Sequence, residues 1–250
     1  MLITGFPAGL AGTNCYVVAP GPGERCVVID PGYKVMSSLD RVLREQRLKP
    51  AAVIVTHGHI DHMFSVTPVC GAHDIPAYVH PGDRYMLADP LSGSILPELN
   101  RRQLAAMVGQ ITFTEPSDVR ELKDGEALGL GGALGFDLVV DHAPGHTPGS
   151  VTFRLPRSAG PAQHEPDVLF TGDLLFAGSI GRTDGPGGDP EAILASLARV
   201  VLPLRDDTVV LAGHGPQTTV GRERASNPFL KGLGDAGPAR RGLQGDEKTT

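Results

Sequence analysis

A short polar segment, residues 56–62, carries four side chains that can bind metal ions. These are His57, His59, Asp61 and His62, and they directly follow an apolar run rich in β-branched residues. Imidazole nitrogens and carboxylate oxygens are common ligands of zinc and similar divalent cations. A histidine-rich polar loop is the alternative, but four ligand-type residues at this spacing after a strand favour metal binding. One ion could not use all four, so we expect the first two to face one cation and the last two to face a second.

Three further ligand-type residues occur later in the chain, again at the ends of apolar runs. His146, Asp173 and His214 are each flanked by glycine. Glycine allows the backbone angles and the close approach that direct a neighbouring side chain towards a shared centre. Aspartate and glycine are also ordinary turn residues, so none of these positions is informative alone. Because the same order of apolar run, glycine and ligand-type residue occurs at each of these places, we predict that these side chains meet at the carboxyl ends of strands.

Apolar periodicity predicts the elements that must position these ligands. Strands are expected near 2–6, 14–19, 25–30, 51–55, 76–80, 126–130, 134–141, 149–155, 167–171 and 208–212. Helices are expected near 36–47, from the metal loop to about 70, and near 82–88, 97–108, 190–201 and 219–226. Asp189 should cap the helix that begins at Pro190. Segment 89–125 is interrupted by proline and glycine, and we expect it to include a lid.

Length and composition are compatible with one α/β domain. The 250 residues, 40% of them apolar, can bury one large core, which we assign to residues 1–230. Residues 231–250 are poor in apolar side chains and are predicted to form a flexible tail. We find neither a tract of about 18 apolar residues nor a signal-peptide pattern, and therefore expect no membrane association and no export. The spacing of Cys15, Cys26 and Cys70 suggests no pairing, which favours reduced thiols in the cytoplasm.

The charge distribution argues against a nucleic-acid partner. The net charge is −6 and there is no basic run, whereas proteins that hold a polyanion need a positive surface. A small-molecule substrate is the expected partner. The sequence does not determine the oligomeric state.

Taken together, these motifs resemble the metallo-β-lactamase superfamily, and within it hydroxyacylglutathione hydrolase (glyoxalase II) and its short, single-domain relatives. The resemblance runs from about residue 14 to about residue 230. It rests on segments 13–16, 30–32, 56–62, 144–149, 171–173, 178–184, 213–215 and 223–228. It implies an α/β fold of the four-layer αββα metallo-β-lactamase sandwich type.

The resemblance also implies a division of the ligands between two metal ions. One ion would be held by His57, His59 and His146, the other by Asp61, His62 and His214, with Asp173 as the bridging carboxylate. Two zinc ions are implied, with iron or manganese as alternatives in one or both sites. Two cations this close can share a water and lower its pKa from about 15.7 towards about 7. Asp61 and Asp173 are therefore also the expected catalytic carboxylates.

The same resemblance implies the hydrolysis of 2-hydroxyacyl thioesters of a small thiol, such as lactoylglutathione or an analogue. Arg182 matches a basic residue that contacts an anionic end of the thiol carrier in glyoxalase II, and a guanidinium suits a carboxylate. An internal ion pair with Asp184 is the alternative for Arg182. The sequence after His214 is too short for the helical domain of the long form, so we expect that domain's glutathione site to be absent.

Other functions remain open at this point. A persulfide dioxygenase would use one iron, but its last histidine is usually followed by Asp-Tyr, whereas Gly215 follows His214 here. A lactonase or other ester hydrolase would keep the same ligands, and a non-catalytic metal-binding or scaffold protein is disfavoured because no ligand position is lost. β-Lactamases of this fold lack a bridging aspartate, so we expect an activity other than antibiotic hydrolysis.

Several other side chains are interpreted as structural. His73, His80, His142 and His164 do not fall on ligand positions, and we expect them to be surface or hydrogen-bonded histidines. Tyr33 could contact substrate or serve only in packing.

Overall fold

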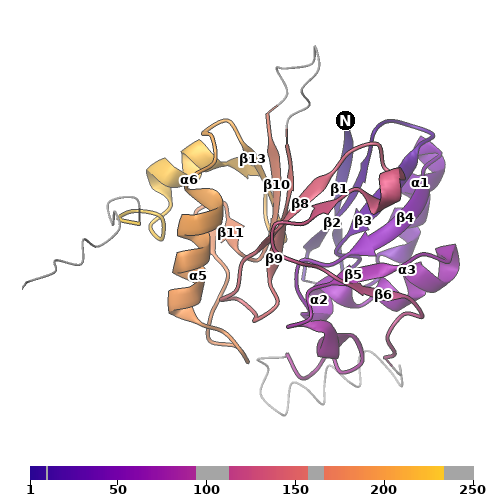
Figure 1. Ribbon diagram of the computed structural model, residues 1–250, viewed down its shortest axis with the longest axis horizontal. Coiled ribbons are helices and arrows are strands. Elements are labelled where there is room, and N and C mark those ends of the chain that lie inside the picture. The colour runs from indigo at the N-terminus through magenta and orange to yellow at the C-terminus, as the bar shows by residue number, and fades with distance from the viewer. Residues whose placement is uncertain (10, 94–112, 157–165, 234–250) are drawn as a thin grey trace, which may run out of the picture.

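The computed structural model describes residues 1–9, 11–93, 113–156 and 166–233, and it consists of two packed β-sheets with helices on both outer faces (Figure 1). The first sheet contains, in spatial order, β1 (Leu2–Ala8), β2 (Thr13–Ala19), β3 (Arg25–Ile29), β4 (Lys49–Ile54), β5 (Ala77–Val79) and β6 (Val119–Glu121). The second contains β14 (Thr218–Thr219), β13 (Val209–Ala212), β10 (Val168–Gly172), β9 (Val151–Leu155), β8 (Leu138–His142) and β7 (Ala127–Leu128). Strands β11 (Leu175–Phe176) and β12 (Ser179–Ile180) form a separate short hairpin.

The helices form the two outer layers. They are α1 (Met36–Gln46), α2 (Ile60–Met63), α3 (Val66–His73), α5 (Pro190–Ser196), its π-helical continuation η3 (Leu197–Val201) and α6 (Val220–Ser226), with 3-10 turns η1 (Arg84–Leu87) and η2 (Leu130–Gly132). Figure 1 shows α1 and α3 beside the first sheet, and α5 and α6 beside the second. The predicted four-layer αββα arrangement is therefore confirmed.

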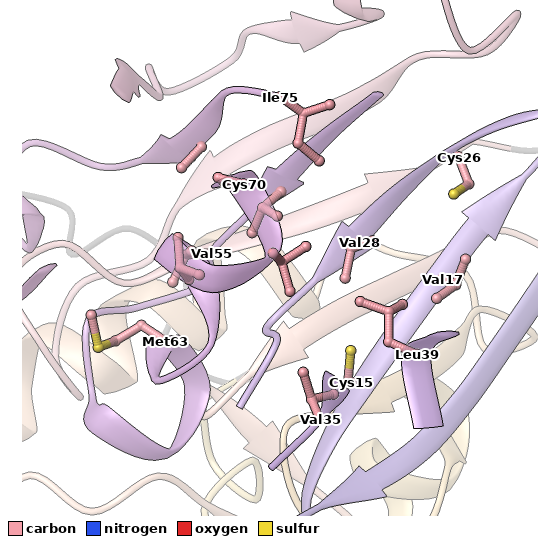
Figure 2. Packing of buried hydrophobic residues seen from close by; sticks show 14 of the residues in the cluster. Cys15, Val17, Cys26, Val28, Val35, Leu39, Val55, Met63, Cys70 and Ile75 are labelled. Atoms are coloured by element: carbon pink, nitrogen blue, oxygen red, sulfur yellow. The ribbon is translucent and has the colours of Figure 1, made fainter. Parts of the chain in front are cut away.

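Three apolar layers hold these elements together. Successive side chains of a strand point to opposite faces, so Val17 packs towards Leu39 of α1 while Val18 joins the core between the sheets. In the second sheet, Phe170 belongs to the same inter-sheet core and Leu169 packs beneath α5. Figure 2 shows the layer beneath α1 and α3.

The three cysteines are structural in this fold. Cys15, Cys26 and Cys70 are all buried as free thiols in the layer beneath α1 and α3. Burial raises the pKa of Cys26 and Cys70 to about 12, so these thiols remain neutral and behave as small apolar side chains.

The strand directions bring the ligand-bearing loops to one edge of the sandwich. Strands β3 and β4 run parallel in the first sheet, and β10 and β13 run parallel in the second. The carboxyl ends of parallel neighbours lie at the same edge. The segments after these four strands carry Asp30, His57, Asp173 and His214, and the sequence predicted the last three of these positions.

Local signals explain where several elements begin. The carboxylate of Asp189 accepts hydrogen bonds from the backbone N–H groups of Glu191 and Ala192, which confirms it as the N-cap of α5. The strand predicted at 134–141 begins only at Leu138, because the chain first makes the turn η2 and then passes through Gly135 with a positive φ. The predicted helix at 97–108 and most of the proposed lid and tail lie outside the described residues.

No helix among the described residues is both long enough and apolar enough to cross a membrane.

Candidate metal centre

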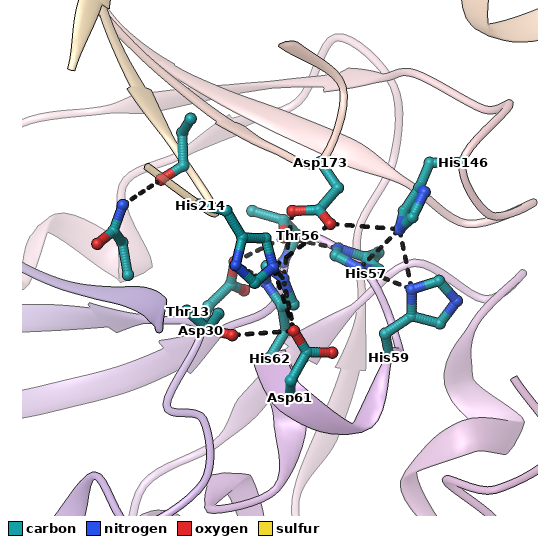
Figure 3. A network of polar contacts seen from close by, with 12 residues as sticks. Thr13, Asp30, Thr56, His57, His59, Asp61, His62, His146, Asp173 and His214 are labelled. Carbon is teal, nitrogen blue, oxygen red and sulfur yellow. Dashed lines mark hydrogen bonds and ion pairs between the residues drawn. The ribbon is translucent and has the colours of Figure 1, made fainter. Parts of the chain in front are cut away.

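Three imidazoles converge at the carboxyl end of β4. His57 Nε2 lies 3.1 Å from His59 Nδ1 and 3.2 Å from His146 Nε2, and the last two nitrogens are 2.9 Å apart. The first two residues leave β4 on a tight loop, while the third is brought in by the loop between β8 and β9 (Figure 3). We call these three residues the first triad.

The outer nitrogens of two of these imidazoles are already used as hydrogen-bond donors. His146 Nδ1 donates to the carbonyl oxygen of Arg182 at 2.8 Å. The Thr56 hydroxyl donates to Asp30 Oδ2 at 2.6 Å, so its oxygen is left to accept from His57 Nδ1 at 3.1 Å. Neutral imidazole has one N–H, so the Nε2 atoms of His57 and His146 both carry lone pairs.

Two lone pairs that face each other at 3.2 Å repel unless a cation lies between them. Zinc binds imidazole nitrogen at about 2.0–2.1 Å, so two ligands of one tetrahedral ion are roughly 3.4 Å apart. The nitrogen separations in the first triad are close to this value. The outer hydrogen bonds to a carbonyl and a hydroxyl are those that usually fix the orientation of a metal-bound histidine. The first triad therefore fits a divalent metal ion.

A second group of ligand atoms lies next to the first. His214 Nε2 is 3.2 Å from Asp61 Oδ2 and 3.3 Å from His62 Nε2. His62 Nε2 is also 3.6 Å from Asp61 Oδ2, so the three atoms face one point. Helix α2 supplies two of the residues and the loop after β13 supplies the third. We call Asp61, His62 and His214 the second triad.

Asp173 lies between the two triads, as Figure 3 shows. Its Oδ1 atom is 3.3 Å from His62 Nε2, and its Oδ2 atom is 3.5 Å from His146 Nε2 and 3.6 Å from His214 Nε2. Oδ1 is buried and has no hydrogen-bond partner among the described residues. A buried carboxylate oxygen without a donor is costly. A shared cation would satisfy it, so Asp173 is placed where a bridging ligand would be needed.

Residues behind the second triad hold it in position. Asp30 Oδ2 accepts a hydrogen bond from His62 Nδ1 at 2.9 Å, and Asp30 Oδ1 accepts one from the backbone N–H of Thr56 at 2.7 Å. Thr13 donates its hydroxyl to Asp61 Oδ2 at 2.9 Å. The sequence motifs include Thr13 and Asp30, but sequence reasoning missed these roles. The side chains come from β2 and from the end of β3, far from the metal loop in the chain.

The backbone also approaches these ligands closely. A Cβ atom on Gly213 would lie 2.6 Å from Cε1 of His62, so no larger residue fits beside His214. This glycine was noted in the sequence only as a neighbour of a ligand. In the structure it allows β13 to bring His214 against the rest of the centre.

The electrostatics of the two triads differ. Burial lowers the pKa of His57, and burial together with the nearby His146 lowers the pKa of His59 to about 4, so both are neutral, which is the metal-binding form. Burial also opposes protonation of His62, but Asp173, Asp61 and Asp30 raise its pKa. Burial alone would raise the pKa of Asp61, yet the nearby His62 and His214 lower it. Asp61 is therefore ionised, and a cation bound by the second triad would replace the proton that the carboxylates hold on His62.

Arg182 does not reach into the centre with its side chain. Its guanidinium binds Asp184 with two hydrogen bonds, at 2.6 and 2.7 Å, and both side chains are exposed. This is the internal ion pair that the sequence offered as the alternative. The backbone carbonyl of Arg182, which sequence reasoning did not consider, contacts the first triad through His146.

The histidines and the tyrosine that were interpreted as structural do not contact any of the ligand atoms among the described residues. His80 and His142 stack on each other with ring centroids 4.0 Å apart, and His142 Nε2 donates to the carbonyl oxygen of Pro148. His73 ends α3. Tyr33 packs edge-on against Phe64. His164 lies outside the described residues.

The comparisons with known proteins identify the family. The family model of the metallo-beta-lactamase superfamily matches residues 8–214. The chain belongs to this superfamily, and the predicted family resemblance is confirmed. The His and Asp clusters described above fit the divalent-metal site of such an enzyme.

Individual relatives cover nearly the whole chain. Protein Rv2581c of Mycobacterium tuberculosis is 49% identical over 234 residues, which are 93% of this chain and 99% of the relative. Hydroxyacylglutathione hydrolase GloC of Haemophilus influenzae is 34% identical over 212 residues, covering 83% of this chain and 88% of GloC.

Two solved structures have closely similar folds. The BLEG-1 B3 metallo-beta-lactamase superposes with a TM-score of 0.75 at 36% identity, covering 92% of this chain and all of BLEG-1 (100%). TTHA1623 in a di-iron-bound form superposes with a TM-score of 0.70 at 36% identity, covering 91% of this chain and 100% of TTHA1623. The chain thus has the fold and the cluster of metal-binding side chains of a metallo-hydrolase.

Proposed function

We propose that this protein is a dinuclear metal-dependent hydrolase that cleaves 2-hydroxyacyl thioesters of a small thiol. The observation that carries the proposal is the position of Asp173 between two triads whose inner atoms all face inwards. The similarity to GloC, named a hydroxyacylglutathione hydrolase, supports the substrate class.

In this proposal the first triad holds one ion and the second triad holds the other, with Asp173 shared between them. Zinc is the proposed metal, because imidazole and carboxylate donors suit it, and iron is the main alternative given the di-iron form of TTHA1623. The bound ions would supply Lewis acidity at a carbonyl and an acidified water at neutral pH.

The protein's own side chains then have separable tasks. Asp173, with 11% of its side chain exposed, fixes the spacing of the two triads. Asp61 is 30% exposed, so it faces the open side of the centre and can accept a hydrogen bond from the attacking water. In the overall reaction a C–O bond forms and the C–S bond breaks. Thiolate is a good leaving group, so the reaction needs no strong protein acid.

Hydrolysis of β-lactams is the second candidate function. It is favoured by the 36% identity to BLEG-1, which its name describes as a B3 metallo-beta-lactamase. The presence of Asp173 at the bridging position argues for the thioesterase. Both functions would use the two triads, so a direct comparison of substrates is needed to separate them.

The deciding experiment combines metal analysis with a substrate panel. The purified protein is loaded with zinc and tested with lactoylglutathione, a lactone, a cephalosporin and glutathione persulfide, in air and under nitrogen. We expect close to two ions per chain and thiol release at the same rate in both atmospheres. Faster turnover of the cephalosporin would favour the second candidate. Iron-dependent oxygen uptake with the persulfide, without thioester cleavage, would overturn the proposal.

A further inference from the structure

A buried carboxylate outside both triads connects the two loops that form the first triad. Asp83 lies between β5 and η1 and is completely buried, with 0% exposure. It accepts hydrogen bonds from Gly58 N–H at 2.8 Å, from the Thr147 hydroxyl at 2.6 Å and from Gly149 N–H at 2.7 Å. Sequence reasoning did not single out this residue.

Two of the three donors are direct neighbours of ligands, and the third, Gly149, lies in the same loop as His146. Gly58 lies between His57 and His59, and Thr147 directly follows His146. One side of the carboxylate, Oδ2, therefore holds the metal loop and the His146 loop at the same time, and Oδ1 holds the latter a second time. His57 and His146 are 89 positions apart in the chain. The distance between their two loops must therefore be set by contacts in the folded protein.

The packing around Asp83 leaves little freedom for the loops to shift. A Cβ on Gly149 would lie 2.6 Å from Cγ of Asp83, and a Cβ on Gly82 would lie 3.0 Å from the backbone nitrogen of Gly149. The Thr147 hydroxyl also contacts Ser150 Oγ at 2.7 Å. The carboxylate is thus enclosed by backbone on several sides.

The Asp83 carboxylate is not itself a metal-ligand candidate. It belongs to none of the groups of converging ligand atoms found among the described residues. Its three donors, two backbone N–H groups and one hydroxyl, are neutral, and burial raises its pKa despite these hydrogen bonds. Burying a carboxylate is unfavourable, so its presence here calls for a compensating role.

We propose that Asp83 is a positioning residue that sets the distance of His57 and His59 from His146 and thereby the metal affinity of the first triad. It acts through the backbone of the two loops and does not touch the ion. This inference rests on the proposed metal centre. Outer groups that orient metal ligands typically change affinity by about 10–100-fold, and we expect an effect of that size.

The test compares Asp83→Asn in two backgrounds that each keep one triad. In His214→Ala only the first triad is intact, and in His146→Ala only the second is. Asparagine keeps the shape of the side chain but replaces one acceptor oxygen with an NH₂ group, which opposes the donors around it. Zinc affinity is measured by competition with a chromophoric chelator. We expect Asp83→Asn to weaken zinc binding about 10–100-fold in the first background and to leave it unchanged in the second.

Thr147→Val provides a milder variant that removes one donor and keeps the volume. It should weaken zinc binding in the first background by a smaller factor. Circular dichroism and the melting temperature of the metal-free proteins monitor folding. An equal loss of affinity in both backgrounds would show a general structural role and overturn the inference, as would unchanged affinity in both. If the wild-type protein itself does not bind two ions, the proposed function is wrong. That result differs from failure of the Asp83 inference, in which the wild-type protein binds two ions but Asp83→Asn has no selective effect.

Discussion

The two triads are built partly from one loop, yet they differ in charge and in exposure. The first has three imidazole ligands and no carboxylate, and His57 and His146 are only 1% and 4% exposed. The second includes a carboxylate, and the side chains of Asp61 and His214 are 30% and 29% exposed. The groups that hydrogen-bond to the outer nitrogens also differ in charge. A neutral hydroxyl and a neutral carbonyl accept from the first triad, whereas the carboxylate of Asp30 accepts from the second.

This difference indicates unequal tasks. A cation in the first triad would keep more of its charge, because neutral ligands do not offset it and burial strengthens its field. A cation in the second triad would be offset by nearby carboxylates and would be reached more easily by solvent. We therefore expect the first site to polarise the substrate and the second to exchange its ion more readily.

The largest expected effect comes from removing the group that both triads share. Asp173→Ala should lower thioester turnover by roughly 10²–10³-fold, comparable to the loss of one preorganised electrostatic group in other enzymes. Steady-state kinetics with metal in excess measure this. Asp118→Asn, a change at an exposed carboxylate directly before β6, is the control and should keep full activity. Near-normal turnover of Asp173→Ala would show that this residue serves only as a turn.

Removing one ligand from each triad should empty that triad selectively. His146→Ala and His214→Ala are each expected to reduce the metal content from two ions to about one per chain. Elemental analysis after dialysis gives the content, and chelator challenge of the wild-type protein gives the order of release. His146→Ala retains the ion of the second triad, and His214→Ala retains the ion of the first. We expect the chelator to remove the ion of the second triad faster than the ion of the first. The opposite order would contradict the exposure argument.

The support behind the second triad can be tested with Asp30→Asn. Asparagine can still accept from His62 but carries no charge, so zinc binding by the second triad should weaken about 10–100-fold. The first triad should weaken by a smaller factor, because Asp30 reaches it only through the Thr56 hydroxyl that accepts from His57. Affinity measured in the His146→Ala background isolates this triad. Together with Asp83→Asn, which is expected to affect only the first triad, the variant shows whether the two supports act independently.

The smallest expected effect concerns Arg182. If its guanidinium leaves Asp184 to bind an anionic thiol carrier, Arg182→Ala should raise KM about tenfold with little change in kcat, the size expected for one charge-assisted hydrogen bond. Arg205→Ala is a matched control, because Arg205 pairs with Asp207 at the same spacing and is also exposed. Equal KM values for the two variants, with a lower melting temperature for Arg182→Ala, would support a purely internal pair.

Much of the centre could be predicted because its signals are local. The ligands lie in segments that follow apolar strands, five of the seven stand beside a glycine, and the seven positions also match a family motif. The capping pattern of Asp189 and Pro190 likewise fixes the start of α5 within a few residues. Such features need no knowledge of distant contacts. Whether these ligands bind the proposed metals remains a prediction.

Other features were missed because they have little or no local pattern. Strands β6 and β14 are three and two residues long, too short to show alternation, and they exist because a neighbouring strand pairs with them. The strand predicted at 134–141 was wrong at its start because glycine turns interrupt the apolar pattern.

The sequence by itself determined the set of ligand-type residues and their position at strand ends, since these follow from residue type and periodicity, and the family resemblance of its motifs implied the αββα class. Only the tertiary structure decided which nitrogens face each other, which groups hold them and where Arg182 points. Many of the contacts responsible join residues far apart in the chain, such as Asp30 with Thr56, 26 positions apart, and His62 with His214, 152 positions apart. Pairings over such distances depend on how the two sheets pack, so the buried carboxylates of Asp30 and Asp83 acquire their roles only in the folded protein.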